Sequence, residues 1–238
     1  MQLPSIRRRL DNWLQFRRLS PLARQVHAEK QTYLSVRKLV RLEAAQAGID
    51  RARVPGDIIE FGIALGGSTV LLARQAARGR RFFGLDVFGM IPSPNPDKDD
   101  VKSMERYRTI ASGAATGIGG DAYYGYRGDL YRHVSDLLAR HGTPVDGITV
   151  HLVKGLFQDT LPELELPTLA LAHVDCDWYD PVRFCLEETA RRMTVGGMIV
   201  VDDYNDYSGC RLAVDEFLAA RREFEFDAGP NPILRRVR

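Results

Sequence analysis

The sequence lacks any apolar run that approaches the roughly 20 residues a helix needs to cross a lipid bilayer. It has only three cysteines and no CxxC spacing among them: Cys176, Cys185 and Cys210. This pattern argues against a disulfide framework or a zinc site and fits a reducing compartment. The N-terminal region contains three consecutive arginines but is too polar for a signal peptide. We therefore expect a protein of the cytoplasm with no membrane span.

Charge is distributed unevenly along the chain. Residues 1–53 contain twelve Lys and Arg but only four Asp and Glu, whereas the remainder contains 21 and 27. A basic segment on an acidic body can bind nucleic acid or a membrane surface. Apolar residues are interspersed among these arginines, which favours a helical arm that packs on its own body or on a second subunit. We therefore predict a homo-oligomer without a nucleic-acid partner.

The hydrophobic pattern predicts an N-terminal helical arm over residues 1–53 and an α/β domain over residues 54–238. In the arm, two helices over 5–19 and 21–48 are separated at Ser20-Pro21, and Ser20 can cap the second helix. Gly48 is the expected stop of that helix. In the domain, predicted strands cover 56–62, 80–86, 148–155, 168–175 and 196–203. Predicted helices cover 68–78, 181–194 and 209–222.

The alternation of strands and helices predicts the fold class. It indicates a doubly wound, mostly parallel sheet with helices on both faces. Two last runs, 224–226 and 233–237, predict an antiparallel C-terminal hairpin that completes a seven-stranded sheet. Residues 87–147 do not fit the alternation, and so long a stretch is usually a functional loop or disordered. Its tyrosines favour a lid or insert that covers a substrate.

The turn after the first strand is rich in glycine and runs from Glu60 through Gly62, Gly66 and Gly67 to Ser68. Glycine lets a ligand approach the backbone, and the next helix offers free N–H groups to an anion. Glu60 belongs to a buried strand, where an unpaired carboxylate is costly, so a cationic ligand group would satisfy it.

Asp86 ends the second predicted strand, 24 residues after Gly62. A carboxylate at this position can accept hydrogen bonds from both hydroxyls of a ribose. The alternative is an aspartate that caps a helix or stabilises a loop. The glycine-rich turn after the first predicted strand and the aspartate at the end of the second together favour a nucleotide-binding site at this edge of the sheet.

Three aspartates follow the fourth and fifth predicted strands: Asp175, Asp202 and Asp203. If these strands are neighbours, the carboxylates meet at one edge and repel one another unless a cation or a shared proton holds them. Carboxylate oxygens suit Mg²⁺ or a similar hard divalent ion. The alternative is a set of helix caps and loop carboxylates. Asp177 leans to the same side as Asp175 if the chain is extended there, where it could accept a proton. His173 is expected to be a packed, hydrogen-bonded histidine.

These motifs resemble the metal-dependent class I S-adenosylmethionine methyltransferases, which have a Rossmann-like fold. From about residue 55 to the end, the segments GDIIEFGIALGGS, KGLFQDTLP, HVDCDWYD and VDDY are similar to the macrocin/mycinamicin family of sugar O-methyltransferases. The resemblance implies S-adenosylmethionine and Mg²⁺ as cofactors. It implies a sugar hydroxyl of a glycosylated natural product or glycolipid as the acceptor.

The resemblance also implies roles for individual residues. Ser68 would bind the methionyl carboxylate, Glu60 the amino group and Asp86 the ribose. Phe157 and Gln158 would flank the adenine, and the other cofactor-binding residues would be Gly62, Gly66 and Asp175. The metal would be held by Asp175, Asp202 and Asp203, with Asp177 as the general base.

Three alternatives remain open from the sequence. Catechol-type methyltransferases share the metal pattern but use a nearby lysine, and no lysine occurs between residues 155 and 238. A nicotinamide-dependent oxidoreductase would suit the sheet and Asp86 but leaves the three later aspartates unexplained. A binding or assembly protein could keep the fold without turnover.

Overall fold

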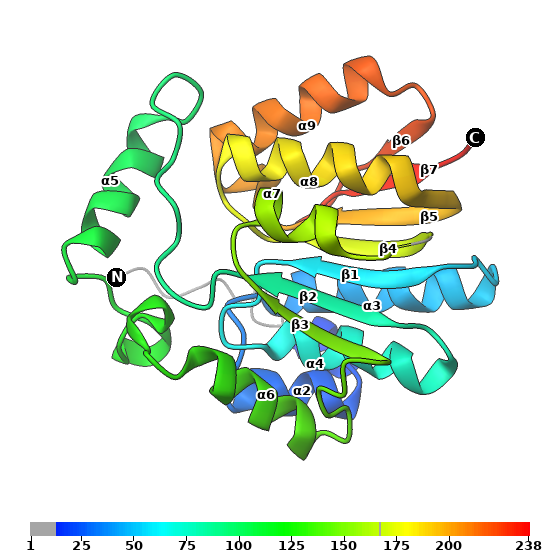
Figure 1. Cartoon of the computed structure of the whole chain (residues 1–238), viewed down its shortest axis with the longest axis horizontal. Helices are drawn as coiled ribbons and strands as arrows, with labels where there is room; N and C mark the ends of the chain where they lie inside the picture. Colours follow the sequence, from blue (N-terminus) through cyan, green and yellow to red (C-terminus); the bar gives the residue numbers. More distant parts are fainter. Residues whose placement is uncertain (1–12, 167) are drawn as a thin grey trace.

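The computed structural model describes residues 13–166 and 168–238, in which a seven-stranded sheet lies between two layers of helices (Figure 1). The strands are β1 (Asp57–Phe61), β2 (Phe82–Asp86), β3 (Val150–Lys154), β4 (Leu169–Val174), β5 (Met193–Val201), β6 (Phe224–Asp227) and β7 (Ile233–Arg236). Their order is β3-β2-β1-β4-β5-β7-β6. The first five strands pair in parallel, and β7 is antiparallel to both β5 and β6. The predicted α/β sheet and its C-terminal hairpin are confirmed.

Helices cover both faces of the sheet because the strand side chains are apolar on both sides. Ile58 and Phe82 pack into one core cluster, whereas their neighbours Ile59 and Phe83 pack into the other. One face carries α2 (Pro21–Ala28), α3 (Val36–Arg51), α4 (Gly67–Ala73) and α6 (Leu130–Arg140), and the opposite face carries α8 (Tyr179–Arg192) and α9 (Ser208–Ala220) (Figure 1). No helix of the described ranges has the length and apolar content of a membrane span.

The N-terminal helices differ from their prediction. Residues 13–18 are helical, and the earlier part of the helix expected over 5–19 lies outside the described residues. Ser20 caps α2 as expected, since its Oγ accepts a hydrogen bond from the Ala23 N–H at 3.1 Å. The continuous helix expected over 21–48 is wrong, because residues 29–35 separate α2 from α3. Within this break the Gln31 carbonyl accepts a hydrogen bond from the Gly67 N–H at 2.8 Å, at the start of α4.

Helix α3 packs closely on the sheet. The expected stop at Gly48 is wrong, because α3 continues to Arg51. A Cβ at Gly48 would lie 3.0 Å from the Met198 Cε of β5, so this glycine serves close packing rather than helix termination. Leu39, Leu42 and Ile49 of α3 are fully buried in the same core cluster as the sheet residues. The N-terminal segment therefore packs on its own body.

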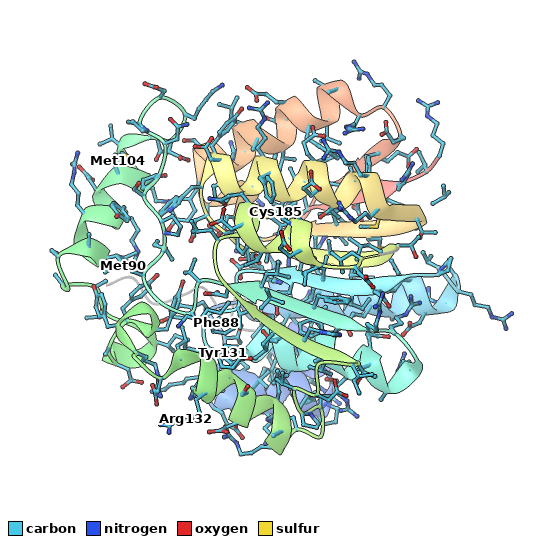
Figure 2. The ribbon with its side chains drawn as sticks, viewed as in Figure 1. Phe88, Met90, Met104, Tyr131, Arg132 and Cys185 are labelled. Carbon is cyan, nitrogen blue, oxygen red and sulfur yellow. The ribbon has the colours of Figure 1, made fainter. Side chains whose placement is uncertain are left out.

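The insert expected over 87–147 has two parts. Helix α6 is a core helix, since Leu130, Val134, Leu137 and Leu138 are buried at the spacing of one helical face. Sequence analysis missed this helix although the spacing was present. The preceding part, which contains α5 (Val101–Ala111), lies beyond the body of the sheet (Figure 1). It is joined to α6 by an edge-to-face contact between Phe88 and Tyr131, whose ring centroids are 4.9 Å apart (Figure 2).

Candidate active site

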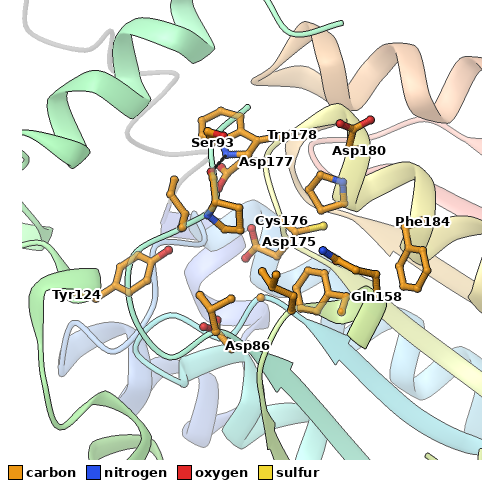
Figure 3. Close-up of a pocket in the computed structure, with 17 residues that line it drawn as sticks. Asp86, Ser93, Tyr124, Gln158, Asp175, Cys176, Asp177, Trp178, Asp180 and Phe184 are labelled. Carbon is orange, nitrogen blue, oxygen red and sulfur yellow. Dashed lines mark hydrogen bonds between the residues drawn. The ribbon is translucent and has the colours of Figure 1, made fainter. Parts of the chain in front are cut away.

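Two adjoining cavities lie at the carboxyl ends of the parallel strands. One, of about 360 Å³, is lined mainly by apolar groups and is called the apolar cavity (Figure 3). The other, of about 330 Å³, is lined by acids, bases and tyrosines and is called the polar cavity. Both are lined by Gly62, Ile91, Tyr124, Asp175, Asp177 and Trp178. Carboxyl ends of strands are where open α/β sheets bind ligands.

The apolar cavity brings together residues from the ends of β2, β3 and β4. Phe157 and Gln158, in the short helix α7 (Phe157–Thr160), line one side with Phe184 of α8. Figure 3 shows Gln158 and Phe184 on the side opposite Tyr124. Phe157 is held edge-on against Phe61 of β1, with ring centroids 5.4 Å apart. The lining suits a flat ring, with the Gln158 amide available for hydrogen bonds.

Asp86 lies at the floor of the apolar cavity and shapes the loop after β1. Its Oδ2 accepts a hydrogen bond from the Ile63 N–H at 2.7 Å, and its Oδ1 accepts one from the Phe88 N–H at 2.6 Å. Burial raises the pKa of Asp86, although these two backbone donors oppose the rise. The Oδ2 also accepts a longer hydrogen bond from the Ala64 N–H at 3.4 Å, so it is the Oδ1 that keeps capacity for a second hydrogen bond.

Two predicted glycines are explained by close approaches. A Cβ at Gly62 would lie 1.7 Å from the Asp175 carbonyl oxygen, and the φ of Gly62 is +85°. Gly62 therefore lets the ends of β1 and β4 meet at the boundary of the two cavities. Gly66 has φ +89°, and a Cβ there would lie 3.1 Å from Val134 of α6. Gly66 thus serves helix packing and lines neither cavity.

Glu60 is fully buried and does not line either cavity. Its carboxylate accepts a hydrogen bond from the Thr69 hydroxyl at 2.6 Å and lies 3.0 Å from the His173 Nδ1. Residues of α4 and β4 therefore supply partners for Glu60 within the protein, and the binding of a ligand amino group by Glu60 stays a prediction. His173 is confirmed as a packed, hydrogen-bonded histidine.

Ser68 also lies away from the cavities, in the first turn of α4, where it is 3% exposed. The N-terminus of this helix is covered, since a Cβ at Gly67 would lie 2.5 Å from the Gln31 carbonyl and 2.7 Å from the Thr32 Cβ. The helix start that the sequence analysis treated as open to an anion is therefore covered by the break between α2 and α3.

The three strand-end aspartates converge as expected. Strands β4 and β5 are neighbours, with Val174 paired to Val201 immediately before Asp175 and Asp202. Asp175, Asp202 and Asp203 each offer an oxygen within 4.8 Å of the others. The Asp202 Oδ1 is buried and has no hydrogen-bond partner in the described residues. The arrangement thus gathers oxygen ligands around one point and leaves one of them unsatisfied.

Burial, and then the charges of neighbouring carboxylates, raise the pKa of Asp175, Asp177 and Asp203. Burial raises the pKa of Asp175 well above its ordinary value, and the charges of Asp202 and Asp203 raise it further. Burial likewise raises the pKa of Asp203, with Asp177 and Asp202 adding to the rise. The pKa of Asp177 is raised to about 6 by burial and then by the charge of Asp202. Such a cluster is stabilised by a cation or by shared protons.

Lys38 of α3 provides one cation at this cluster. Its Nζ lies 2.6 Å from the Asp202 Oδ2 and 2.8 Å from the Asp206 Oδ2. Burial favours the neutral amine, but both aspartates outweigh that effect and raise the pKa of Lys38. The sequence argument considered lysines only from residue 155 onward and therefore missed Lys38. Because Lys38 is held as an ammonium in this arrangement, it has no lone pair with which to accept a proton.

Asp177 reaches both cavities by a turn rather than by an extended strand. Its φ is +59°, and the Trp178 N–H donates to the Cys176 carbonyl at 2.7 Å, which closes a three-residue turn. The chain is therefore not extended at Asp177, and the turn rather than strand alternation sets its position. The Asp177 N–H donates to the Asp203 Oδ2 at 3.1 Å. Backbone strain of this kind is concentrated at functional sites.

Sequence analysis did not name most residues of the polar cavity. Its wall includes a group of aromatic side chains: Tyr33, Tyr123, Tyr124, Trp178 and Tyr207. They contact one another, with ring centroids 4.4 Å apart for Tyr123 and Tyr124 and 5.1 Å for Trp178 and Tyr207. The tyrosine-rich stretch was the available signal for two of them. Two basic residues of α5, Lys102 and Arg106, complete the lining.

Comparisons with known proteins agree with this geometry. The family model of macrocin O-methyltransferase (TylF) matches residues 22–115 and 131–225. The demethyldecarbamoylnovobiocin O-methyltransferase of Streptomyces niveus is 27% identical over 199 residues, which cover 81% of this chain and 69% of the relative. The mycinamicin III 3''-O-methyltransferase of Micromonospora griseorubida is 26% identical over 193 residues, with 78% and 69% covered.

Solved structures show the same fold. The O-methyltransferase NovP superposes with a TM-score of 0.72 at 23% identity, covering 87% of this chain and 83% of NovP. The calicheamicin methyltransferase CalS11 gives a TM-score of 0.63 at 19% identity, covering 98% and 94%. This chain therefore belongs to the macrocin O-methyltransferase (TylF) family and is an S-adenosylmethionine-dependent O-methyltransferase.

Proposed function

We propose that this enzyme methylates a sugar hydroxyl of a glycosylated natural product and that it requires Mg²⁺. The observation that carries the proposal is the set of three carboxylates within 4.8 Å of one another that line the polar cavity, one of which, Asp175, also lines the apolar cavity. Relatives support the acceptor class by their names. One is a 4'-O-methyltransferase of a rhamnosyl-tetracenomycin from Streptomyces olivaceus, and the solved CalS11 is described as a TDP-rhamnose 3'-O-methyltransferase.

The acidic cluster fits a hard divalent cation. Its ligands are carboxylate oxygens, and the Asp202 Oδ1 is buried without a partner. Asp175, Asp202 and Asp203 would hold the ion, and Lys38 would remain beside Asp202 and Asp206. When bound, Mg²⁺ would lower the pKa of an acceptor hydroxyl, as metal ions do for bound water.

The apolar cavity fits the methyl donor. Phe157 and Gln158 would flank the adenine, and Asp86 would accept hydrogen bonds from the ribose at the floor of the cavity. Gly62 lets the donor lie against the backbone where the two cavities meet. When bound, S-adenosylmethionine supplies a methyl group on a sulfonium, whose thioether leaving group needs no acid. The contribution of these residues is orientation, which can supply roughly 7–11 kcal/mol of a barrier.

Asp177 is the proposed general base. It lines both cavities, so its carboxylate faces the region between donor and acceptor. A proton leaving the acceptor hydroxyl would move to a carboxylate oxygen of Asp177. Such a positioned base typically contributes 10²–10⁴-fold to the rate.

The polar cavity fits a sugar. Tyrosine and tryptophan offer flat apolar faces beside hydroxyl and N–H groups, which matches a ring that carries hydroxyls. Residues 87–128 form much of this wall, and we propose that they act as the lid expected from the sequence. We also infer a cytoplasmic location from the three free cysteines, and a homo-oligomer from the half-exposed Trp13 and Leu14.

Donor-site binding and methyl transfer should be measured separately to test the proposed function. Calorimetry should show binding of S-adenosylhomocysteine, and binding of NAD alone would contradict the proposal. Methyl transfer should then be assayed on a panel of glycosides and catechols, with Mg²⁺ or with excess EDTA. Transfer to glycosides that EDTA abolishes is the expected result. Transfer to catechols alone, or transfer unaffected by EDTA, would refute the acceptor class or the metal requirement respectively.

A further inference from the structure

One face of α5 points into the polar cavity and carries two cations. Lys102, Arg106 and Ile110 follow one another at intervals of four residues and therefore share a helical face. All three line the polar cavity. Other α5 residues, such as Glu105 and Arg108, are exposed and line neither cavity. Arg106 is thus half-buried at the acceptor space, whereas Lys102 lines the cavity and is also exposed to solvent.

Neither cation has a hydrogen bond or ion pair with a carboxylate of the described residues, although the charge of Arg106 acts on Asp177 through space. The Arg106 guanidinium lies 5.6 Å from the ring centroid of Tyr123, with no hydrogen bond or ion pair in residues 13–166 and 168–238. The Lys102 Nζ donates to the Asp206 backbone carbonyl at 2.6 Å and lies 4.8 Å from the ring centroid of Tyr207. Lys38, in the same cavity, is instead paired with two aspartates.

The charges of the polar cavity are therefore divided between two walls. Carboxylates gather at the ends of β4 and β5, where Lys38 and the proposed metal ion would balance them. The α5 wall presents the guanidinium of Arg106, which has no hydrogen bond or ion pair within the described ranges, and the ammonium of Lys102. A neutral sugar would leave the five N–H donors of Arg106 without a charged partner. An anionic group on that side would form charge-assisted hydrogen bonds with them.

We infer that the acceptor sugar carries an anionic group, a carboxylate or a phosphate, that Arg106 and Lys102 bind on the α5 wall. This inference rests on the proposed function, since it requires the sugar hydroxyl to face Asp177. Arg106 is then a specificity-determining residue: its planar fork binds either oxyanion through two parallel hydrogen bonds. Aromatic rings beside it keep the sugar between the two walls.

The test measures acceptor binding without turnover. The enzyme is loaded with S-adenosylhomocysteine and Mg²⁺ and titrated with methyl β-D-glucuronide, its neutral counterpart methyl β-D-glucoside, and glucose 1-phosphate. We expect the anionic sugars to bind at least about 10-fold more tightly than the glucoside, as charge-assisted hydrogen bonds allow. Whichever of the two anions binds more tightly identifies the oxyanion.

Two variants assign the effect to the α5 wall. Arg106→Gln should remove most of the preference, so that the anionic sugars and the neutral glucoside bind with similar affinity. Arg108→Gln removes the same charge from the same helix outside the cavities and should leave the preference intact. Equal affinity for charged and neutral sugars, a preference that survives Arg106→Gln, or no binding of any of the three sugars would overturn the inference. Failure of the proposed function would appear separately, as loss of S-adenosylhomocysteine binding or as absence of glycoside methylation.

Discussion

The two cavities of this enzyme are built in different ways. The apolar cavity is assembled from strand ends and the turns directly after them, such as Asp86 at the end of β2 and Phe157 after β3. The polar cavity brings together residues from distant segments, with Lys38, Arg106 and Asp203 all lining it. The fold itself therefore determines most of the apolar cavity, whereas the insert and the N-terminal segment determine the polar one. Changes in the two cavities should have separable effects on donor binding and on transfer.

The largest effects are expected at the aspartates. Asp203 lines only the polar cavity, so Asp203→Asn should abolish metal-dependent transfer while S-adenosylhomocysteine affinity stays nearly unchanged. Asp175 lines both cavities, so Asp175→Asn should impair both. Loss of a direct metal ligand should exceed the roughly 10–100-fold that loss of an outer partner costs. Calorimetry and transfer assays on both variants measure this, and normal transfer by Asp203→Asn would refute the metal site.

Asp177→Asn tests the base. We expect kcat to fall by about 10²–10⁴-fold, because the amide cannot accept the acceptor proton. The left-handed turn at Asp177 should tolerate asparagine, which adopts this conformation readily. S-adenosylhomocysteine affinity should therefore remain close to that of the unchanged enzyme. Full activity of the variant would show that another group takes the proton.

The difference between the cavities also explains what the sequence predicted. Asp86 ends an apolar strand, and Asp175 and Asp202 directly follow two others, so the parallel sheet brings them to one edge without knowledge of any loop. Phe157 and Gln158 could be placed for the same reason. The position of Lys38 depends on the break between α2 and α3, which is stabilised by a contact between Gln31 and Gly67, distant in sequence. A long-range backbone contact of this kind leaves no local sequence pattern.

The hydrogen-bond partners of some buried polar groups are distant in sequence, which is a second reason why parts of the site could not be predicted. Glu60 looked unpaired because its partners, Thr69 and His173, lie 9 and 113 residues away. Arg106 lies on one face of α5, and α5 belongs to the insert of residues 87–147, which did not fit the strand–helix alternation. The sequence therefore did not show that this face lines a cavity. The sequence shows which groups are costly to bury, but the tertiary structure determines which of them are satisfied internally and which remain available to a ligand.

Gly62 tests the junction of the two cavities, with Gly79 as its control. Both have positive φ, +85° and +81°, but a Cβ at Gly79 has no atom within 4 Å. Gly79→Ala should therefore cost only the left-handed backbone penalty, about 1–2 kcal/mol. Gly62→Ala adds a clash with the Asp175 carbonyl and should cost about 3 kcal/mol or more, with weaker S-adenosylhomocysteine binding. Equal losses in chemical denaturation would show that the β1 and β4 ends can separate at little cost.

The smallest effect is expected at the aromatic wall of the apolar cavity. Phe157→Ala should weaken S-adenosylhomocysteine binding by about 10-fold, which is the size of one lost aromatic contact. The loss should be no larger, because Phe61, which packs on the Phe157 ring, can fill part of the space that the ring leaves. At saturating donor, kcat should be nearly unchanged, since Phe157 does not line the polar cavity. Phe226→Ala, at an exposed phenylalanine of β6 that lines neither cavity, should change neither quantity. A fall in kcat for Phe157→Ala at saturating donor would mean that the two cavities are coupled, because the apolar wall would then set the alignment of the methyl group as well as the affinity for its carrier.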